Sequence, residues 1–275
     1  MMSYAGFGMF YLAFGLSVLG LEIALGRHRG IYTRADWLVN LLCAGIGSAV
    51  ARPLLAIALA DGFGLLLPGQ RNMLAHDPVW VVFAVMLLVD EFLFYWVHRL
   101  SHQGRNKKWL AWLWKLHRTH HSGKYMTTLL VFRINPVWTL IQPPAWVIAF
   151  TLYMGQPMAA ALLAVSEYAW NVITHSNFRW DDAVRRAPVV GRMFRLAEHV
   201  FVSPGLHHTH HGFGKDGANY RNFGFILSVF DTLFGTLHVP QGRPWRYGLP
   251  GKNPHWSEEV FYPLVRGAGR AVDGE

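Results

Sequence analysis

Residues 78–102 read PVWVVFAVMLLVDEFLFYWVHRLSH, an apolar run that ends in the pair His98 and His102. The run has about the 20 residues that an α-helix needs to cross the hydrocarbon of a bilayer. Residues four positions apart lie on one face of a helix, so both imidazoles can point at a common object beyond the run. The stretch therefore predicts a membrane helix that carries two histidines to a site at the membrane surface.

Two more histidine clusters have helical spacing, and one histidine stands alone: His117-x2-His120-His121, His207-x2-His210-His211 and His175. Spacings of three and four residues let each cluster present its side chains to one centre. His208 breaks the pattern and is interpreted as a bystander. Imidazole suits zinc, iron, copper and nickel, whereas the single cysteine, Cys43, lies far from every cluster and disfavours a thiolate-ligated zinc site. The number of histidines predicts two metal ions.

The composition indicates a membrane protein. Of the 275 residues, 52% are hydrophobic and only 15% are charged, which is unusual for a soluble chain. We expect an all-α fold with a bundle of four to five transmembrane helices. The apolar segments that predict the bundle are 7–25, 37–60, 78–97, 136–154 and 157–174. Arg52-Pro53, near the middle of the second segment, predicts that this segment is broken, tilted or only partly inserted.

Basic residues predict the orientation. They are dense after the first apolar segment and between His98 and Arg133, whereas residues 61–77 carry only Arg71. The positive-inside rule then places the amino terminus outside, five crossings in the membrane and every histidine cluster on the cytoplasmic side. The location would be the inner membrane in a bacterium. The first segment is expected to remain as a membrane helix, since it is too long for a signal core and lacks a basic start.

The net charge of +9 is expected of cytoplasmic Lys and Arg beside anionic headgroups. We expect no nucleic-acid partner, because basic and aromatic residues are not interleaved.

A polar stripe crosses the fifth apolar segment, where Glu167, Asn171 and His175 recur every four residues. A carboxylate inside a membrane span is costly and usually faces an internal polar site. We expect His175 to be a ligand and Glu167 to accept a hydrogen bond from a ligand or, as the less favoured choice, to bind metal itself. Asn171 would hold a water or orient a neighbour. Asp90 and Asp231 are the other carboxylates expected to accept N–H bonds from ligand histidines.

With these residues assembled, the chain resembles the sterol desaturase/fatty acid hydroxylase superfamily of integral-membrane, non-haem diiron oxygenases. The resemblance covers residues 90–236. The matching motifs, in order, are Tyr95-Trp96-Val97-His98-Arg99-Leu100-Ser101-His102, His117-Arg118-Thr119-His120-His121, His175-Ser176-Asn177, Ser203-Pro204 with His207-x2-His210-His211, and Asn222-Phe223-Gly224 running to Phe234-Gly235-Thr236.

The resemblance implies a bundle of transmembrane helices topped by a cytosolic helical cap that holds a dinuclear metal site, in a single membrane-embedded catalytic domain over 1–275. Residues 237–275 are rich in proline and glycine and are expected to form an irregular tail. It also implies two iron ions that use O2 and external electrons to hydroxylate or desaturate an unactivated C–H position of a lipid-like substrate. By matching position, the ligands would be His98, His102, His117, His120, His121, His175, His207, His210 and His211. Some members have a further histidine where this chain has Asn171, which leaves a tenth ligand open. Zinc is expected to replace iron in isolated protein.

The electrons must come from a separate ferredoxin, cytochrome or reductase, because the sequence has no four-cysteine cluster or dinucleotide fingerprint. Arg105, Lys107 and Lys108 would suit an acidic donor. Two other functions stay open. The related acyl-lipid desaturases also use three histidine boxes, although the ending at Thr236 favours the hydroxylase superfamily. A membrane metal-binding or transport protein is less favoured, because transport sites usually lie at mid-membrane in broken helices.

Overall fold

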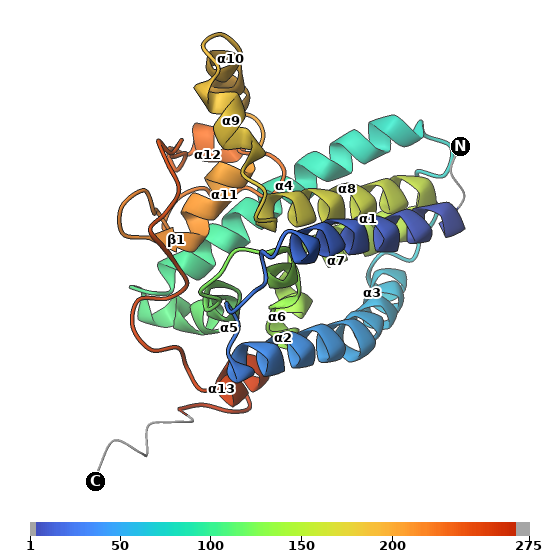
Figure 1. Cartoon of the computed structure of the whole chain (residues 1–275). Coiled ribbons are helices and arrows are strands. Elements are labelled where there is room, and N and C mark those ends of the chain that lie inside the picture. Colours follow the sequence, from blue (N-terminus) through green and yellow to red (C-terminus); the bar gives the residue numbers. More distant parts are fainter. Residues whose placement is uncertain (1–3, 268–275) are drawn as a thin grey trace.

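Long helices occupy one side of the computed structural model, which describes residues 4–267, and short helices and loops occupy the other (Figure 1). The long helices are α1 (Tyr4–Ala24), α2 (Arg34–Ile46), α3 (Arg52–Leu66), α4 (Val79–Gln103), α7 (Pro143–Tyr153) and α8 (Pro157–His175). Apolar side chains of α4, α7 and α8, among them Val82, Val147 and Leu163, form a core between these helices. The structure is mostly helical, as expected.

Helices α2 and α3 form one continuous apolar helix of 33 residues, Arg34–Leu66. A π-helical turn at Gly47–Ala51 joins them, directly before Arg52-Pro53. The helix is therefore not broken at the expected position but forms one wider turn there. Pro53 lies within the first two positions of α3, where a missing N–H is tolerated. At 1.5 Å per residue the helix is about 50 Å long, more than a bilayer's hydrocarbon thickness of about 30 Å.

Segment 136–154, expected as one membrane helix, is two helices. They are α6 (Pro136–Ile141) and α7, separated at Gln142. Pro143 and Pro144 explain the break, because proline disfavours a helical conformation in the residue before it and removes a backbone donor. Of the helices between residues 4 and 267, Arg34–Leu66 and Val79–Gln103 are long and apolar enough to cross a membrane. Four to five crossings stay a prediction.

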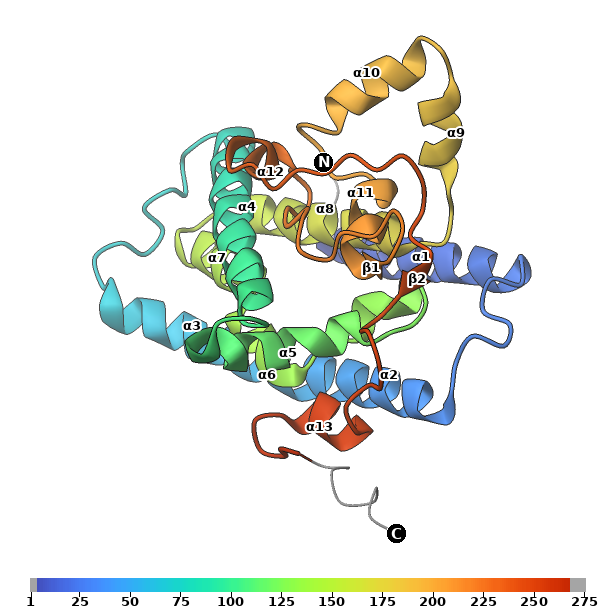
Figure 2. The same ribbon diagram turned by 90° about the vertical axis from the view of Figure 1, so that its left-hand side faces the viewer.

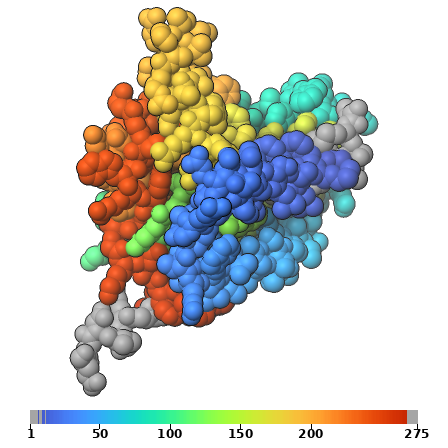
Figure 3. Space-filling model, viewed as in Figure 1, coloured from blue at the N-terminus to red at the C-terminus, as the bar shows by residue number. Residues whose placement is uncertain are grey.

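Shorter elements form the cap: two 3₁₀ helices, Lys108–Leu110 and Thr128–Phe132, and α5 (Ala111–His121), α9 (Trp180–Arg186), α10 (Val190–Ala197), α11 (Pro204–His211), α12 (Val229–Leu233) and α13 (Trp256–Phe261). Strands β1 (Gly212–Phe213) and β2 (Arg246–Tyr247) pair antiparallel. Helices α9 and α10 project from the body (Figure 3).

The carboxy-terminal segment is more ordered than the irregular tail that we expected. Between 237 and 267 it contributes β2 and α13, and α13 packs against α2 and α5. Arg133 links α13 to α2, because its guanidinium donates to Glu259 of α13 at 2.9 Å and to Asp36 of α2 at 3.0 Å. Residues 268–275, the last part of the expected tail, lie outside the described residues, as do residues 1–3 of the expected domain.

Candidate metal centre

The nine histidines singled out from the sequence converge in two adjacent groups. One group is His98 and His102 of α4, His117 and His121 of α5, and His210 of α11. The other is His120 of α5, His175 of α8, and His207 and His211 of α11. Within each group the ligand atoms all lie within 4.8 Å of one another, and every ring is buried except the half-buried His120. Figure 2 shows α4, α5, α8 and α11 meeting around the middle of the molecule.

Short distances join the ring nitrogens within each group. In the first group, His102 Nε2 lies 3.1 Å from the Nε2 atoms of both His117 and His121. In the second, His175 Nε2 lies 3.1 Å from His120 Nε2 and 2.9 Å from His207 Nε2. Nitrogens that converge in this way can share a metal ion between them, as the sequence spacing predicts.

The groups also adjoin each other. The rings of His121 and His211, one from each group, stack with their centroids 4.4 Å apart.

Backbone carbonyls fix the protonation pattern of three ligand rings. His98 Nδ1 lies 2.8 Å from the Phe223 carbonyl, and His210 Nδ1 lies 2.7 Å from the Arg221 carbonyl. His175 Nδ1 is likewise 2.9 Å from the carbonyl of Asn171. A carbonyl can only accept, so the hydrogen is on Nδ1 and the Nε2 lone pair is free for a metal.

The buried ring nitrogens that have no hydrogen-bond partner among the described residues include the Nε2 atoms of His98, His210 and His211. Unpaired buried polar atoms are costly, and metal ligation would satisfy all three. The donor set is all imidazole, which fits iron, zinc or copper rather than magnesium or calcium. The residues present therefore fit two transition-metal ions.

Burial keeps the ligand rings neutral. It lowers the pKa of His117, His121, His207 and His211 well below the ordinary histidine value, and charges on neighbouring histidines lower it further. Neutral imidazole is the form that binds a metal ion. The cap thus presents ligands that need no deprotonation at neutral pH.

His208 lies outside both groups, in agreement with its interpretation as a bystander. Its Nε2 lies 3.1 Å from the Ser176 carbonyl, and its Nδ1 lies 3.3 Å from the Tyr247 hydroxyl. The ring therefore packs α11 against the loop after α8 and against β2.

The carboxylates expected to accept N–H bonds from the ligand rings have other surroundings, and backbone carbonyls take that role for His98, His175 and His210. Asp231 accepts N–H bonds from Phe223 at 2.8 Å and Gly224 at 2.7 Å, so it holds the loop whose carbonyl meets His98. Asp90 and Glu167 are buried and interact with each other electrostatically. Neither belongs to a histidine group, so the direct coordination considered for Glu167 is not seen.

Glu91 was missed by the sequence reasoning. It is fully buried on α4 and accepts N–H bonds from Phe225 at 3.3 Å, Ile226 at 2.8 Å and Leu227 at 2.9 Å. It holds the same loop as Asp231, from the opposite end. The sequence does contain a signal for Glu91: it is a second carboxylate, directly after Asp90, within an apolar run.

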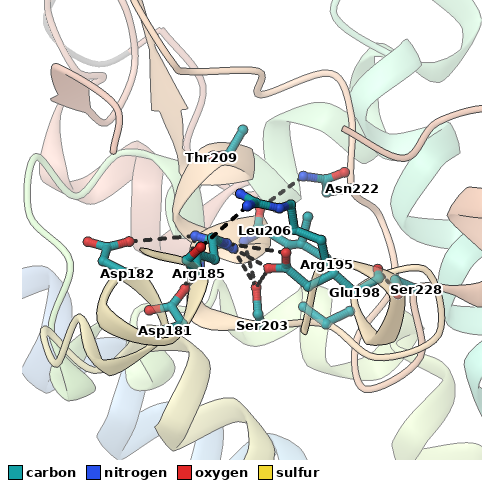
Figure 4. Close-up of polar contacts among 12 residues, drawn as sticks. Asp181, Asp182, Arg185, Arg195, Glu198, Ser203, Leu206, Thr209, Asn222 and Ser228 are labelled. Carbon is teal, nitrogen blue, oxygen red and sulfur yellow. Dashed lines mark hydrogen bonds and ion pairs between the residues drawn. The ribbon is translucent and has the colours of Figure 1, made fainter. Parts of the chain in front are cut away.

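A buried polar network fixes the start of α11 (Figure 4). Ser203 caps the helix, and Arg185 donates to its hydroxyl at 3.0 Å while pairing with Glu198. Asp181 accepts the Gly205 N–H at 2.7 Å. These contacts set where α11 begins, and therefore where its three ligand histidines lie.

A cavity of about 340 Å³ opens onto the centre. Five of the histidines line it: His98, His117, His120, His175 and His207. Glu167 and Asn171, the other members of the stripe on α8, also line it, so the stripe faces the cavity that adjoins the metal groups. The remaining walls are mostly apolar and include residues of α3, α7 and α8 and of the loop at 224–225. The arrangement can place an apolar molecule beside two metal ions.

The family model for fatty acid hydroxylase matches residues 83–236. Alkylglycerol monooxygenase of Danio rerio is 25% identical over 91% of this chain and 52% of its own length. Ornithine lipid hydroxylase OlsE of Rhizobium tropici is 28% identical over 72% of this chain and 57% of its own. Delta(7)-sterol 5(6)-desaturase ERG3A of Gibberella zeae is 24% identical over 78% and 56%.

The chain thus spans about half the length of the curated relatives that it matches. Their names are those of oxidoreductases that act on lipids or sterols. No solved structure matches the chain. Because the family model covers more than half of the chain and includes all nine histidines, the chain belongs to the fatty acid hydroxylase family.

Proposed function

We propose that this protein is a membrane-bound, non-haem diiron oxygenase that hydroxylates or desaturates an unactivated C–H position of a lipid-like substrate. The observation that carries the proposal is the pair of adjacent, all-imidazole groups opening on a largely apolar cavity. The oxidoreductase names of the relatives support the reaction class. O2 is the co-substrate, and the electrons come from a separate protein.

The ligands of the first metal would be His98, His102, His117, His121 and His210, and those of the second His120, His175, His207 and His211. Two iron ions held there would supply the activation of O2 and the oxidation of a C–H bond. The chain's own part is to hold the ligand rings through backbone carbonyls and to keep the substrate against the centre. Glu167 and Asn171 lie on the cavity wall and would contact the substrate or a water beside it.

The proposed topology has five membrane crossings, an outside amino terminus and a cytoplasmic cap, in a single domain. The two membrane-length helices and the grouping of all nine histidines on the cap side of the long helices support it. The packing of α13 on α2 and α5 supports treating the carboxy-terminal segment as part of this domain.

Electron delivery is proposed to occur at the basic loop after α4, which carries Arg105, Lys107 and Lys108. Lys107 and Lys108 are exposed, so an acidic ferredoxin, cytochrome or reductase can approach them. Reversing the charge of both lysines should slow electron transfer and weaken its dependence on salt. Transfer rates equal to wild type would reject this docking site.

Metal analysis tests the centre. Protein produced with iron should contain about two iron ions per chain, and His210→Ala and His211→Ala, one from each group, should each lower that content. His208→Ala is the matched control: it alters the same helix but should leave the iron content near wild type. Equal losses in all three variants would mean that α11 matters only for folding.

The reaction is tested in cells and with purified protein. Expression together with an electron donor should give lipids heavier by one oxygen or lighter by two hydrogens, measured by mass spectrometry. Purified protein should consume O2 only when a reductant and a substrate are present. An unchanged lipidome from cells in which the protein is loaded with iron and reduced would contradict the proposal.

A further inference from the structure

Faces of α3, α7 and α8 form much of the cavity wall, and the faces of α3 and α8 carry both polar and apolar residues. On α3 the lining residues are Arg52, Leu55, Ala56 and Leu59, which have the spacing of one helical face. On α8 they are Ala164, Glu167, Tyr168, Asn171 and His175. The direction in which each helix runs therefore determines which polar groups lie at the same end.

The two ends of the cavity can be assigned from packing. The α3 and α7 helices lie side by side and parallel, because Phe63 contacts Phe150 at 5.3 Å and Tyr153 at 5.9 Å near their carboxyl ends. At the opposite ends, α6 packs against the π-helical turn that precedes Arg52. The α8 helix follows α7 after a short turn, packs against it and runs back, so its last residue, His175, lies at the amino-terminal end of α7.

The cavity consequently has a polar end and an apolar end. Arg52, Gln142 and Thr139 line it at the same end as the metal ligands. Leu59, Leu152 and Ala164 line it at the far end, about two helical turns away along α3 and about three along α7 and α8.

The Arg52 guanidinium has no hydrogen bond or ion pair to any residue of the described part of the chain. Its side chain is exposed while it lines the cavity, which places the guanidinium at an opening. Arg185, Arg133 and Arg243, by contrast, are buried in ion pairs. A guanidinium is suited to bidentate binding of phosphate or carboxylate, and such charge-assisted bonds are stronger than neutral ones.

We propose that Arg52 binds the anionic headgroup, a phosphate or carboxylate, of a lipid substrate whose chain runs between α3, α7 and α8. Gln142 and Thr139 supply further polar contacts, and Leu55, Leu59 and Leu152 contact the chain. Because the headgroup and the metal ligands share one end of the cavity, the oxidised carbon lies near the headgroup rather than near the end of the chain. This inference rests on the proposed function for the oxidation step, but not for the binding step.

Binding is measured without turnover, on iron-loaded protein kept free of O2 in nanodiscs of neutral phosphatidylcholine. The probes are hexadecyl phosphate, hexadecanoate and the neutral hexadecan-1-ol, each at a fixed mole fraction, with retained ligand quantified by native mass spectrometry. The wild type should prefer the two anions about tenfold, which corresponds to about 1.4 kcal/mol. Arg52→Gln should abolish the preference, and Arg52→Lys should restore most of it.

Arg71→Gln is the matched control, because Arg71 is also exposed but does not line the cavity. It should keep the wild-type preference. An Arg52→Gln protein that still prefers the anions, or a wild type without a preference, overturns the proposal. The proposal is also overturned if inorganic phosphate, added together with hexadecan-1-ol, is retained as strongly as hexadecyl phosphate. In that case the ligand of Arg52 would be a free anion and not a lipid headgroup.

Product analysis gives the second readout. With an electron donor and O2, oxidation should occur within the first few carbons beyond the headgroup, and oxidation near the methyl end would contradict the orientation. Iron content and O2 uptake are measured on every variant, so loss of the oxygenase function is distinguishable from loss of headgroup binding.

Discussion

His98, His175 and His210 are held by carbonyls of the main chain, so the orientation of these rings depends on where loops lie. The carbonyl that meets His98 belongs to Phe223, whose N–H is bound by Asp231. Two carboxylates, Asp231 and Glu91, therefore act on the centre through one loop. The loop from 223 to 227 therefore orients a proposed metal ligand without supplying one itself.

Replacing Glu91 by glutamine should loosen that loop. The carboxylate accepts three backbone N–H bonds, whereas an amide presents an NH₂ group to at least one of those donors. Leaving a buried donor unpaired costs about 1–3 kcal/mol, so we expect a lower melting temperature and a lower iron content. Calorimetry and elemental analysis measure the two effects. Asp61→Asn, which alters an exposed carboxylate of α3, should change neither.

Helical spacing is a local property, and it is enough to single out from the sequence the nine histidines that converge in the structure. His117 and His121 lie four residues apart and join one group, while His120 between them joins the other. That division depends on how α5 packs between α4 and α11, which no local pattern contains. The carbonyl acceptors are equally invisible, since every residue has a carbonyl and only the fold selects Phe223 or Arg221.

At the scale of elements, proline had opposite effects in two apolar segments. Pro53 follows a π-helical turn inside a continuous helix, whereas Pro143 and Pro144 separate α6 from α7. The sequence predicts an interruption at Arg52-Pro53, without its kind, and predicts none in segment 136–154. The reason is that proline removes a donor in each case, and tertiary contacts decide whether the helix continues.

The packing of α13 against α2 and α5 should depend on the buried pair of Arg133 and Glu259. Arg133→Met leaves a buried carboxylate without its partner, for which we expect a loss of about 3–5 kcal/mol in unfolding free energy. The double variant Arg133→Met/Glu259→Met should recover most of that loss. Thermal unfolding of the two single variants and the double variant measures the coupling, and additive effects would contradict it.

The same pair predicts a dependence on pH. Burial raises the pKa of Glu259 above its usual value; Arg133, Ser122 and Arg118 oppose this rise, while Asp36 adds to it. A carboxyl with a raised folded pKa contributes stability at low pH that is lost as the pH rises through that pKa. Removing Arg133 raises the pKa further. The melting-temperature deficit of Arg133→Met relative to wild type should therefore be largest at pH 8 and shrink towards pH 5.

The apolar end of the cavity predicts chain-length selectivity. Ala164 lines the cavity on α8 at the end away from the metal groups. Ala164→Leu adds volume there, so binding of long alkyl chains should weaken more than that of chains several methylenes shorter, by about 1–3 kcal/mol for an overpacked site. Retention of C10 and C16 alkyl phosphates in nanodiscs measures the difference. An equal loss for both lengths would mean that the chain does not reach Ala164.

At the scale of the whole molecule, the cap and the long helices divide the chain by polarity. Buried ion pairs and histidine groups lie in or next to the cap, whereas α1, α3 and α4 expose many large apolar side chains, such as Leu16, Leu54 and Leu88. Such surfaces are stable against lipid and unfavourable in water. The distribution supports insertion of the long helices, with the metal centre close to the boundary between lipid and water.

Cysteine labelling tests the orientation of this arrangement. The only native cysteine, Cys43, is buried and can be replaced by serine to give a cysteine-free background. Gly69→Cys places a thiol in the exposed connection between α3 and α4, and Lys252→Cys places one at an exposed position in the cap. The proposed topology puts the first outside and the second in the cytoplasm, because basic residues favour the cytoplasmic side. A membrane-impermeant maleimide should then label the Gly69→Cys protein in intact cells and the Lys252→Cys protein only after permeabilisation. The reverse result would mean that the protein has the opposite orientation in the membrane. Labelling of both variants in intact cells would place the metal centre outside, beyond the reach of a cytoplasmic electron donor.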